Sequence, residues 1–546
     1  MAKKHRKPKE VRSATSMERP RLRSRLLVAL SCIVIGAAMC LPWLWPSLGW
    51  TIWLSVAGMA AITSRGTPRQ IFWRMWLVGY AMHTAGAHWL PDVLERFARH
   101  PPALAWTLIL ALHAVGALRY ALAGWIVAWL RGDRPGILLL PVVWTALEFL
   151  WPSLFPYRLG QALLQFPVLV QLTEWTGAFG PTFLVVWGGT LLHVVLAGVW
   201  MARPISGAKQ QRRAGGEPAF TPVSLRWHLT GFAAAITLTV VYGLVRIRTI
   251  EQAMAASPVL RVALIQPGTM GRERLRACMQ LSKNLPEDVQ LIVWPESAIG
   301  ALSMEFDDFR SAQQLEEEGR DPESPLIGPR AYYLVGGDSF LLEPERHFNS
   351  ALLISPEEKI LARYHKRTLI PFGEYIPGER WFPSMRRFSP WEIAFEAGDS
   401  AEPLVMEGGA RLGICICYED LLPGLNRASV SAGAELLVNL TNDAWFGDSM
   451  ALPQHQHLAL MRTIENRRYL LRATTTGSTA IVSPIGVVVS QAPMREPAVI
   501  LGDVHPLNIT TFYTRFGDVF AWLCVAAVAF IAARSRLRAR QKKLTA

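Results

Sequence analysis

The sequence predicts a two-part protein, in which an α-helical polytopic membrane domain of about eight transmembrane helices carries one water-soluble α/β domain. Three observations predict this fold class. Hydrophobic residues make up 51% of the 546 residues and charged residues only 18%, which is unusual for a soluble protein. The apolar residues gather in long runs, nearly all of them in the first half of the chain. Between about residues 257 and 510, short apolar strands alternate with helical patterns, which is typical of α/β domains.

Eight apolar runs are candidate membrane spans, because about 20 apolar residues in a helix cross the hydrocarbon core of a bilayer. The candidates are Leu26–Trp45, Leu48–Thr63, Ile71–Leu90, Leu104–Leu130, Gly136–Trp151, Gly177–Met201, Trp227–Val245 and Val519–Ala533. The first run has the length of a span and is followed by others, so we interpret it as an uncleaved anchor and not as a signal peptide.

Basic residues are distributed unevenly about these spans, and the net charge of the chain is +14. An even number of spans leaves both termini on one side, and the short loops on the other side then hold only Arg96, Arg99 and Arg158. Under the positive-inside rule, this asymmetry places the termini in the cytoplasm and the α/β domain outside it. The charge is therefore explained by topology, without a nucleic-acid partner.

The expected domain organisation follows from these patterns. It comprises a disordered basic cytoplasmic tail at 1–25, a membrane domain with seven helices at 26–250, the α/β domain at 257–510, an eighth helix at 517–534 and a second basic cytoplasmic tail at 535–546.

Within the α/β domain we expect strands whose near-continuous apolar character indicates sheets covered on both faces. The expected strands are Val259–Gln266, Val289–Trp294, Tyr332–Gly336, Ser350–Ile354, Leu412–Cys417, Glu435–Asn439 and Thr479–Val482. Helical patterns cover Arg272–Leu285 and Gln456–Leu471. No glycine-rich phosphate-binding loop follows any of these strands, so the sequence does not indicate a nucleotide cofactor.

Three polar clusters stand out among these strands. They are Trp294-Pro295-Glu296-Ser297, then Tyr364-His365-Lys366 followed by Pro371-Phe372-Gly373-Glu374-Tyr375, and Cys417-Tyr418-Glu419. A cysteine thiol becomes a strong nucleophile only when it loses its proton, and Glu296 is the candidate base. Attack on an ester or amide carbonyl creates an oxyanion, which the Lys366 ammonium group can stabilise while Glu374 holds that group charged and aimed. Each residue alone fits an ordinary structural role, but the ordered set favours catalysis.

Two cysteines compete for the place of the nucleophile. Cys415 and Cys417 are two positions apart on one predicted strand, so both side chains can point to the same face. Only Cys417 adjoins Glu419 and Asp420, where we expect the chain to leave the core and its side chains to meet a substrate. We therefore expect Cys417 to be the nucleophile and Cys415 to pack in the core.

The order of carboxylate, ammonium group and thiol resembles the Glu-Lys-Cys triad of the nitrilase superfamily, and its union with a polytopic membrane domain closely resembles the apolipoprotein N-acyltransferase family. The motifs that carry this resemblance are Trp-Pro-Glu-Ser-Ala, Pro-Phe-Gly-Glu-Tyr-Ile-Pro, Ile-Cys-Tyr-Glu-Asp and Asn442-Asp443-Ala444-Trp445-Phe446-Gly447. The resemblance implies a nitrilase-like αββα sandwich in which Glu296, Lys366 and Cys417 are catalytic. The supporting residues would be Glu374, Tyr418 and Glu419, and the candidate substrate contacts are Trp445, Phe446 and Asn442.

The resemblance also implies a reaction and its partners. Cys417 would take an acyl chain from a phospholipid as a thioester, and the α-amine of the S-diacylglyceryl cysteine of an apolipoprotein would accept it, as the last step of lipoprotein maturation. The enzyme would need no cofactor or metal and would act as a monomer in the bacterial cytoplasmic (inner) membrane, with its catalytic domain on the periplasmic side. His455 and His457 lack a third ligand type at a fixed spacing, so we interpret them as structural or near the site.

Two other functions remain open on the sequence alone. One is a membrane-tethered amidase or nitrilase of the same superfamily, which would release a free acid instead of transferring an acyl group. The other is a transporter or sensor whose outer domain only resembles an enzyme. In that case Arg119 or Glu148, which lie within the predicted spans, would be essential and Cys417 would be dispensable.

Overall fold

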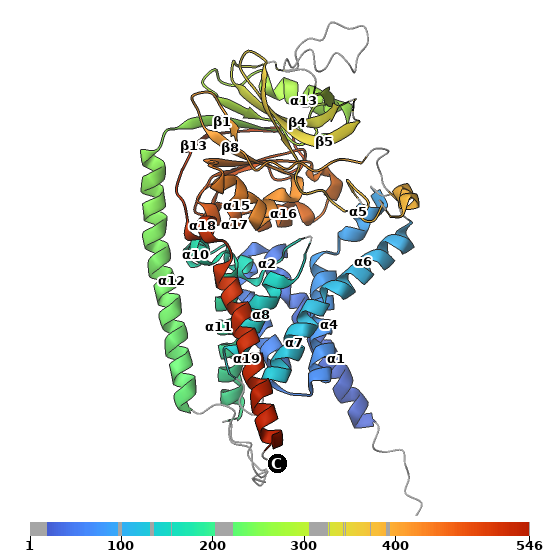
Figure 1. Ribbon diagram of the computed structural model, residues 1–546, viewed down its shortest axis with the longest axis vertical. Coiled ribbons are helices and arrows are strands. Elements are labelled where there is room, and N and C mark those ends of the chain that lie inside the picture. The colour runs from blue at the N-terminus through green and yellow to red at the C-terminus, as the bar shows by residue number, and fades with distance from the viewer. Residues whose placement is uncertain are drawn as a thin grey trace, which may run out of the picture.

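The computed structural model describes residues 19–96, 101–131, 136–153, 155–201, 222–304, 326, 328–341, 343, 345–371, 373–379, 381–388 and 394–544. A helical part and a two-sheet sandwich follow one another along the long axis of the molecule (Figure 1). The expected basic tail up to residue 18 and most of the basic segment between the sixth and seventh expected spans lie outside the described residues.

The helical part consists mainly of the first half of the chain. Its elements are α1 (Arg19–Met39), α2 (Leu41–Leu44), η1 (Pro46–Thr51), α3 (Ile52–Ser64), α4 (Pro68–Gly86), α5 (Leu90–Arg96), α6 (Pro102–Gly116), α7 (Leu118–Leu130), α8 (Leu139–Leu150), η2 (Leu159–Leu163), α9 (Pro167–Val170), α10 (Thr173–Thr176), α11 (Phe179–Met201), α12 (Pro222–Ala256) and, from the C-terminus, α19 (Val519–Leu544).

Six helical segments of the described chain are long and apolar enough to cross a membrane. They are Ser24–Leu44, Pro46–Ser64, Pro102–Leu130, Phe179–Gly198, Leu225–Ala256 and Val519–Arg538. The other two of the eight expected spans correspond to α4, which carries Arg69 and Arg74, and to α8, which has only 12 residues. The structure therefore supports a membrane protein with at least six candidate spans.

The start of α1 differs from the expectation. Composition predicts disorder for residues 1–25, yet α1 begins at Arg19. Arginine is a good helix former, so the apolar helix that follows extends backwards into the basic segment. The seventh expected span is also longer than its apolar core, because α12 continues to Ala256, just before the first strand.

Two sheets make up the sandwich. The first has the order β13-β1-β2-β4-β5-β6, with β3 paired to β4, and the second has the order β12-β11-β10-β9-β8-β7. The strands of the first sheet are β1 (Leu260–Gln266), β2 (Leu291–Val293), β3 (Ala301–Ser303), β4 (Tyr332–Leu341), β5 (Arg346–Ile354), β6 (Ile360–His365) and β13 (Ala498–Val504). Those of the second are β7 (Leu404–Val405), β8 (Arg411–Ile416), β9 (Leu436–Thr441), β10 (Leu470–Thr474), β11 (Ala480–Val482) and β12 (Val488–Gln491). In each sheet the central strands run parallel, as β1 does to β2 and β8 does to β9.

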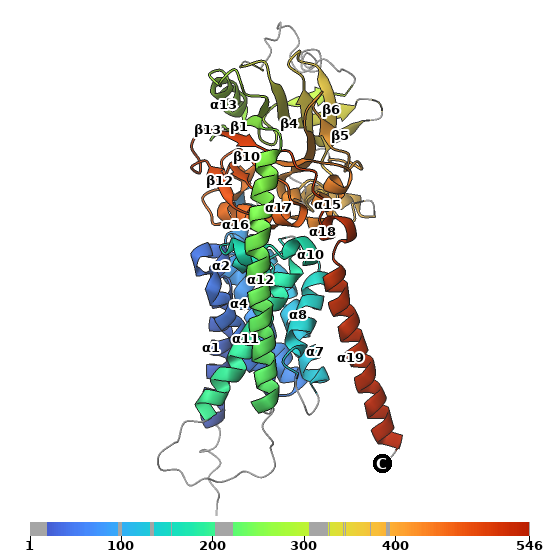
Figure 2. The same ribbon diagram turned by 90° about the vertical axis from the view of Figure 1, so that its left-hand side faces the viewer.

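Both faces of each sheet are covered, as the apolar strands predict. Along β1, Leu264 packs into the core between the two sheets, whereas Ala263 and Ile265 pack towards α13 (Arg272–Ser282) on the outer face. The helices α15 (Pro423–Ser431), α16 (Ala451–Ala459) and α17 (Met461–Asn466) cover the second sheet and lie between it and the helical part (Figures 1 and 2). The layers are thus α, β, β and α, and the second helical layer rests on the helical part.

The helix expected over Gln456–Leu471 is wrong beyond Asn466. It divides at Leu460, and α17 ends at Asn466. Arg467 then adopts φ +53°, and Leu470 begins the strand β10. The apolar pattern of this segment fits both a helix and a fully buried strand, and pairing with β9 and β11 decides for the strand.

Buried polar side chains join the sandwich to the helical part. Gln454 on α16 accepts hydrogen bonds from Trp89 Nε1 at 3.0 Å and Tyr157 Oη at 2.7 Å, and its own amide donates to Gly86 O at 3.0 Å. His457 lies 3.1 Å from Gln161 O through its Nε2. These contacts tie α16 to segments that are remote in the sequence.

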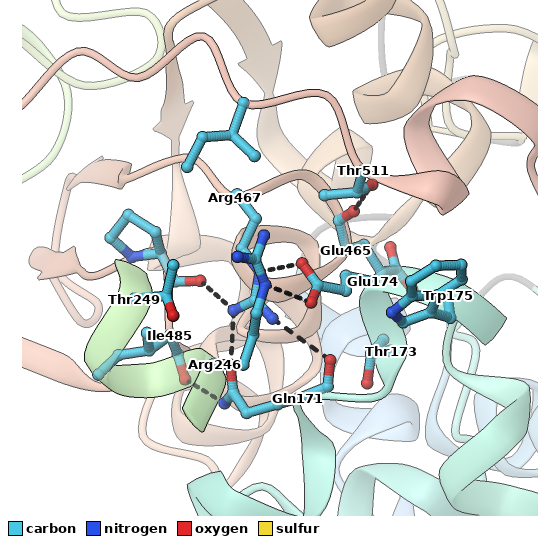
Figure 3. Close-up of polar contacts among 12 residues, drawn as sticks. Gln171, Thr173, Glu174, Trp175, Arg246, Thr249, Glu465, Arg467, Ile485 and Thr511 are labelled. Carbon is cyan, nitrogen blue, oxygen red and sulfur yellow. Dashed lines mark hydrogen bonds and ion pairs between the residues drawn. The ribbon is translucent and has the colours of Figure 1, made fainter. Parts of the chain in front are cut away.

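A second junction holds α12, which stands at one side of the molecule and whose candidate membrane span is only 6% buried (Figure 1). Glu174 on α10 accepts from Arg246 Nε of α12 at 2.6 Å and from Arg467 Nε of the sandwich at 2.8 Å (Figure 3). Arg467 also donates to Gln171 Oε1 at 2.6 Å. Burial tends to raise the pKa of Glu174, but the two arginines and Tyr242 outweigh it and hold this pKa below its ordinary value.

Replacing this carboxylate, Glu174→Gln, is expected to lower the free energy of unfolding by about 3 kcal/mol, because it leaves the fully buried Arg467 guanidinium without its counter-ion. The measurement is the thermal unfolding midpoint in detergent. Since the native pKa of Glu174 is depressed, the difference between the two proteins should be present at neutral pH and disappear as the pH falls through that pKa. Glu251→Gln removes an exposed carboxylate from α12, the helix that contributes Arg246 to this junction, and serves as the control; equal midpoints for the two variants contradict the prediction.

Candidate active site

Cys417 lies at a strained turn where β8 ends and the short helix η4 (Cys417–Leu421) begins. Its φ of +58° is in the left-handed region, which costs a non-glycine residue about 1–2 kcal/mol. Two side chains hold the turn: Asn439 Nδ2 donates to Cys417 O at 2.8 Å, and the Glu419 carboxylate accepts from Ile416 N at 2.8 Å. The turn directs the chain out of the sheet at the cysteine.

Glu419 braces this turn against the end of β6. Its carboxylate also accepts from the backbone N–H groups of Arg367 at 2.7 Å and Thr368 at 2.8 Å, and from Tyr364 Oη at 2.8 Å. The expectation that the chain leaves the core at Glu419 and Asp420 is wrong, because both side chains are fully buried. Burial raises the pKa of Glu419 despite these donors. The residue fixes the segment after Lys366 next to the turn of Cys417.

Lys366 is fully buried between two carboxylates. Its Nζ lies 2.7 Å from Glu374 Oε1 and 3.7 Å from Glu296 Oε1, and it sits 5.8 Å from the centre of the Tyr418 ring. Burial alone favours the neutral amine, but the neighbouring acidic groups, Cys417 once it is ionised and the carboxylates of Glu374 and Glu296, outweigh it and raise the pKa of Lys366 above its ordinary value. The structure thus keeps one ammonium charge in a site that water barely reaches.

Glu296 follows β2, just before Ser297, whose φ is also positive at +52°. Its Oε1 accepts from Asn349 Nδ2 at 2.7 Å, and its Oε2 accepts from the backbone N–H of Asn442 at 2.7 Å. Asn349 also donates to Glu374 Oε1 at 3.2 Å. Both carboxylates are therefore held in fixed orientations around Lys366.

The thiol of Cys417 shares this environment. Burial is the largest influence and raises its pKa well above the ordinary value; Glu296 raises it further, and Lys366 opposes the rise. The resting thiol is therefore protonated at neutral pH, and it needs a base to react. The structure brings Glu296, Lys366 and Cys417 together, as the sequence predicts. Glu374 and Tyr418 lie beside Lys366, and Glu419 holds the turn at Cys417 through Ile416 N.

Cys415 occupies a different environment from Cys417. Its Sγ lies 3.2 Å from Asn426 Oδ1 on α15, whereas Cys417 packs with residues between the two sheets. The expectation that the two thiols can share a face is wrong, because the positive φ turns the backbone at Cys417.

The three candidate substrate contacts differ in burial and in what they touch. Asn442 is buried and holds Glu296 through its backbone. Phe446 packs edge-on against Trp89 of the helical part, with ring centres 5.2 Å apart. Trp445 is half-buried on the same turn. Within the described residues, no group of three or more His, Cys, Asp or Glu side chains is arranged to hold a metal ion.

Sequence reasoning missed two residues of the site, Asn349 and Asn439. Asn349 is the shared donor to Glu296 and Glu374, and Asn439 holds the carbonyl of Cys417. Both are polar residues inside buried strands, β5 and β9. That position is the signal that marks them, because a buried amide needs partners that only the folded site supplies.

Comparison with known proteins extends these observations to the whole chain. The model of the carbon-nitrogen hydrolase family matches residues 261–512, and the model of the apolipoprotein N-acyltransferase N-terminal domain matches residues 35–191. Among solved structures, an amidase of the nitrilase superfamily from Nesterenkonia AN1 has a TM-score of 0.32 and 21% identity, covering 47% of this chain and 93% of that chain. Nit3 of Saccharomyces cerevisiae has a TM-score of 0.34 and 16% identity, covering 47% of this chain and 94% of that one.

Curated relatives match both parts together. The apolipoprotein N-acyltransferase of Geobacter metallireducens is 31% identical over 526 residues, covering 92% of this chain and 94% of the relative. That of Pseudomonas putida is 28% identical and covers 85% of this chain and 88% of the relative. Such identity over nearly the full length of both chains shows that the protein belongs to the apolipoprotein N-acyltransferase family, within the nitrilase superfamily.

Proposed function

We propose that the protein moves an acyl chain from a phospholipid, through a thioester on Cys417, to the α-amine of the S-diacylglyceryl cysteine of apolipoproteins. The observation that carries this proposal is the burial of Lys366 between Glu296 and Glu374 beside a strained cysteine turn. Family membership supports the acceptor, since the full-length relatives bear the name of this activity. The helical part supports a donor that resides in the bilayer.

In the first step, Glu296 removes the proton of the Cys417 thiol, and the thiolate attacks the ester carbonyl of the phospholipid. The carbonyl oxygen becomes an oxyanion, which Lys366 and a backbone N–H at the start of η4 stabilise. The oxyanion then collapses, the ester C–O bond breaks, and the leaving alkoxide takes the proton from Glu296. The products are a lysophospholipid and an acyl thioester on Cys417.

In the second step, the α-amine of the acceptor attacks the thioester carbonyl at the same position. Glu296 takes a proton from the attacking nitrogen, the C–S bond breaks, and the proton passes to the departing thiolate of Cys417. An amide forms and the resting enzyme returns. The site is shielded from water, since Lys366 is 0% and Cys417 only 6% exposed. This shielding protects the thioester from hydrolysis until the acceptor amine attacks it. Trp445, half-buried beside the site, is the proposed contact for the acyl chain.

The proposed location is the bacterial inner membrane, crossed by eight helices, with the catalytic domain (about 257–510) on the periplasmic side and the protein acting as a monomer. The basic end of α19 supports this orientation. This end carries Arg534, Arg536, Arg538 and Arg540 and lies at the far end of the molecule from the sandwich (Figure 1). Basic residues at that end suit the cytoplasmic side.

The test is to incubate the purified protein with a phospholipid and a synthetic S-diacylglyceryl lipopeptide that has a free α-amine. Mass spectrometry should show N-acylated lipopeptide and lysophospholipid appearing in equal amounts. Release of free fatty acid without acylated lipopeptide would instead support the membrane-tethered hydrolase.

A further inference from the structure

A buried ring of four charged side chains lies behind the candidate site. Asp420 belongs to η4, the helix that starts at Cys417; Asp443 opens η5 (Asp443–Phe446); His455 belongs to α16 and Arg472 to β10. The four residues are between 0% and 3% exposed. None of them takes part in the chemical steps described above, so this costly burial of charge calls for another role.

His455 joins the two carboxylates through both of its ring nitrogens. Nδ1 lies 3.0 Å from Asp443 Oδ1, and Nε2 lies 3.0 Å from Asp420 Oδ1. An ionised carboxylate can only accept hydrogen bonds, so both ring nitrogens carry a proton and the ring is an imidazolium. The pKa values agree: burial favours the neutral ring, but Asp420 and Asp443 outweigh it and raise the pKa of His455 to about 9.

Arg472 balances the remaining negative charge but does not replace these hydrogen bonds. Its Nε lies 3.1 Å from Asp420 Oδ2 and its Nη2 lies 3.9 Å from Asp443 Oδ2. None of its guanidinium nitrogens has hydrogen-bond geometry towards a described residue. Within the described chain, His455 is therefore the side chain that links the two carboxylates by directional bonds.

The two carboxylates belong to the two turns that build the candidate site. Asp420 is in the turn of Cys417. Asp443 directly follows Asn442, whose N–H donates to Glu296 Oε2 at 2.7 Å. The position of His455 thus sets how Cys417 lies relative to Asn442, the residue that orients Glu296. A displacement of about 1 Å between such groups can lower the reaction rate about 10²-fold.

We propose that His455 is a positioning residue for acyl transfer, which holds the turn of Cys417 and the turn of Asn442 in register through its two hydrogen bonds. This inference rests on the function proposed above. The charged groups that face the ring are Asp420 from η4, Asp443 from η5 and Arg472 from β10, and the Phe446 ring packs edge-on with its centre 6.2 Å away. When the imidazolium loses a proton, one of the two hydrogen bonds is lost, and the turns of Cys417 and Asn442 are no longer held at a fixed distance from one another.

The test measures the steady-state rate of lysophospholipid release by the full-length protein in phospholipid–detergent micelles that also contain the S-diacylglyceryl lipopeptide as acceptor, from pH 6 to about 10. Background release by Cys417→Ala protein is subtracted. In the unchanged protein the rate should fall as the pH rises through about 9, the pKa of His455. His455→Gln should lower kcat about 10²-fold, leave KM for phospholipid within about twofold, and remove that alkaline fall. His457→Gln, two residues along the same helix, is the control and should retain both the rate and the pH profile.

An unchanged kcat and pH profile in folded His455→Gln protein overturns the proposal. If that variant does not fold, Gly477→Ala decides, because a Cβ at position 477 would lie 2.3 Å from Asp443 Oδ2 and must displace that side chain while every charge is kept. A reduced kcat in Gly477→Ala supports the proposal, and an unchanged one overturns it. Failure of the unchanged protein to form a thioester on Cys417 would overturn the proposed function itself. Equal rates in the unchanged protein and the His455→Gln variant would overturn only the role of His455.

Discussion

Replacement of Lys366 by methionine is expected to lower the rate of thioester formation at least about 10³-fold. The ammonium group lies between Glu296 and Glu374, and its loss removes the donor that stabilises the oxyanion. Loss of such a donor alone lowers the rate about 10²- to 10³-fold. It also leaves the two buried carboxylates without the cation between them, so they repel one another and the base is misplaced. Methionine keeps the length of the side chain, so packing changes little.

The measurement for Lys366→Met is the first-turnover release of lysophospholipid, together with a thermal unfolding curve. We also expect a loss of stability of about 3–5 kcal/mol at neutral pH, because one partner of a buried charge cluster is removed. Lys359→Met changes an exposed lysine directly before β6, the strand that Lys366 directly follows, and is the control. A folded Lys366→Met protein that forms the thioester at the control rate contradicts the assigned role.

The second large effect is expected for Glu296→Gln, which should slow thioester formation about 10²- to 10⁴-fold. Glutamine keeps the size of the side chain and an oxygen that can accept from Asn442 N, but it cannot take the proton of Cys417. The ion pair of Lys366 with Glu374 remains. The stability should therefore change less than in Lys366→Met, and the loss should appear in kcat more than in KM.

Glu287→Gln, an exposed change shortly before β2, is the matched control for Glu296→Gln. Both proteins are compared over the same range of phospholipid concentration. Equal kcat values would show that Glu296 is not the base.

The sequence predicts strands that are covered on both faces, because the patterns it relies on are local, whereas the two-sheet sandwich was implied only by the family resemblance. The strand β1 starts within one residue of its expected position, and its alternation between two cores explains why the run is apolar throughout. The strand β10 was not predicted, since its apolar residues fit a helix equally well and only pairing with β9 distinguishes the two. The helix α4 carries Arg69 and Arg74, although it packs within the bundle against α1 and α7.

The residues of the proposed triad could be selected from the sequence because each lies in a motif next to a strand end. What surrounds the triad could not, because those partners are distant in the chain. Glu419 was expected to meet substrate, but it accepts hydrogen bonds from the segment after β6, more than 50 positions earlier. Asn349 and His455 act through contacts between separate strands and turns. Side-chain chemistry can be inferred from residue type, whereas these contacts depend on which turns the fold brings together.

The intact mass of the protein after incubation with phospholipid tests the central claim most directly. The account predicts a single added acyl mass on the unchanged protein, removed by mild base, retained in Cys415→Ala and missing in Cys417→Ala. Cys415→Ala is a close control, because that thiol lies two positions before Cys417, on β8, and contacts Asn426 of α15 instead of the site. No acyl adduct on the unchanged protein, or an undiminished one in Cys417→Ala, would contradict the account.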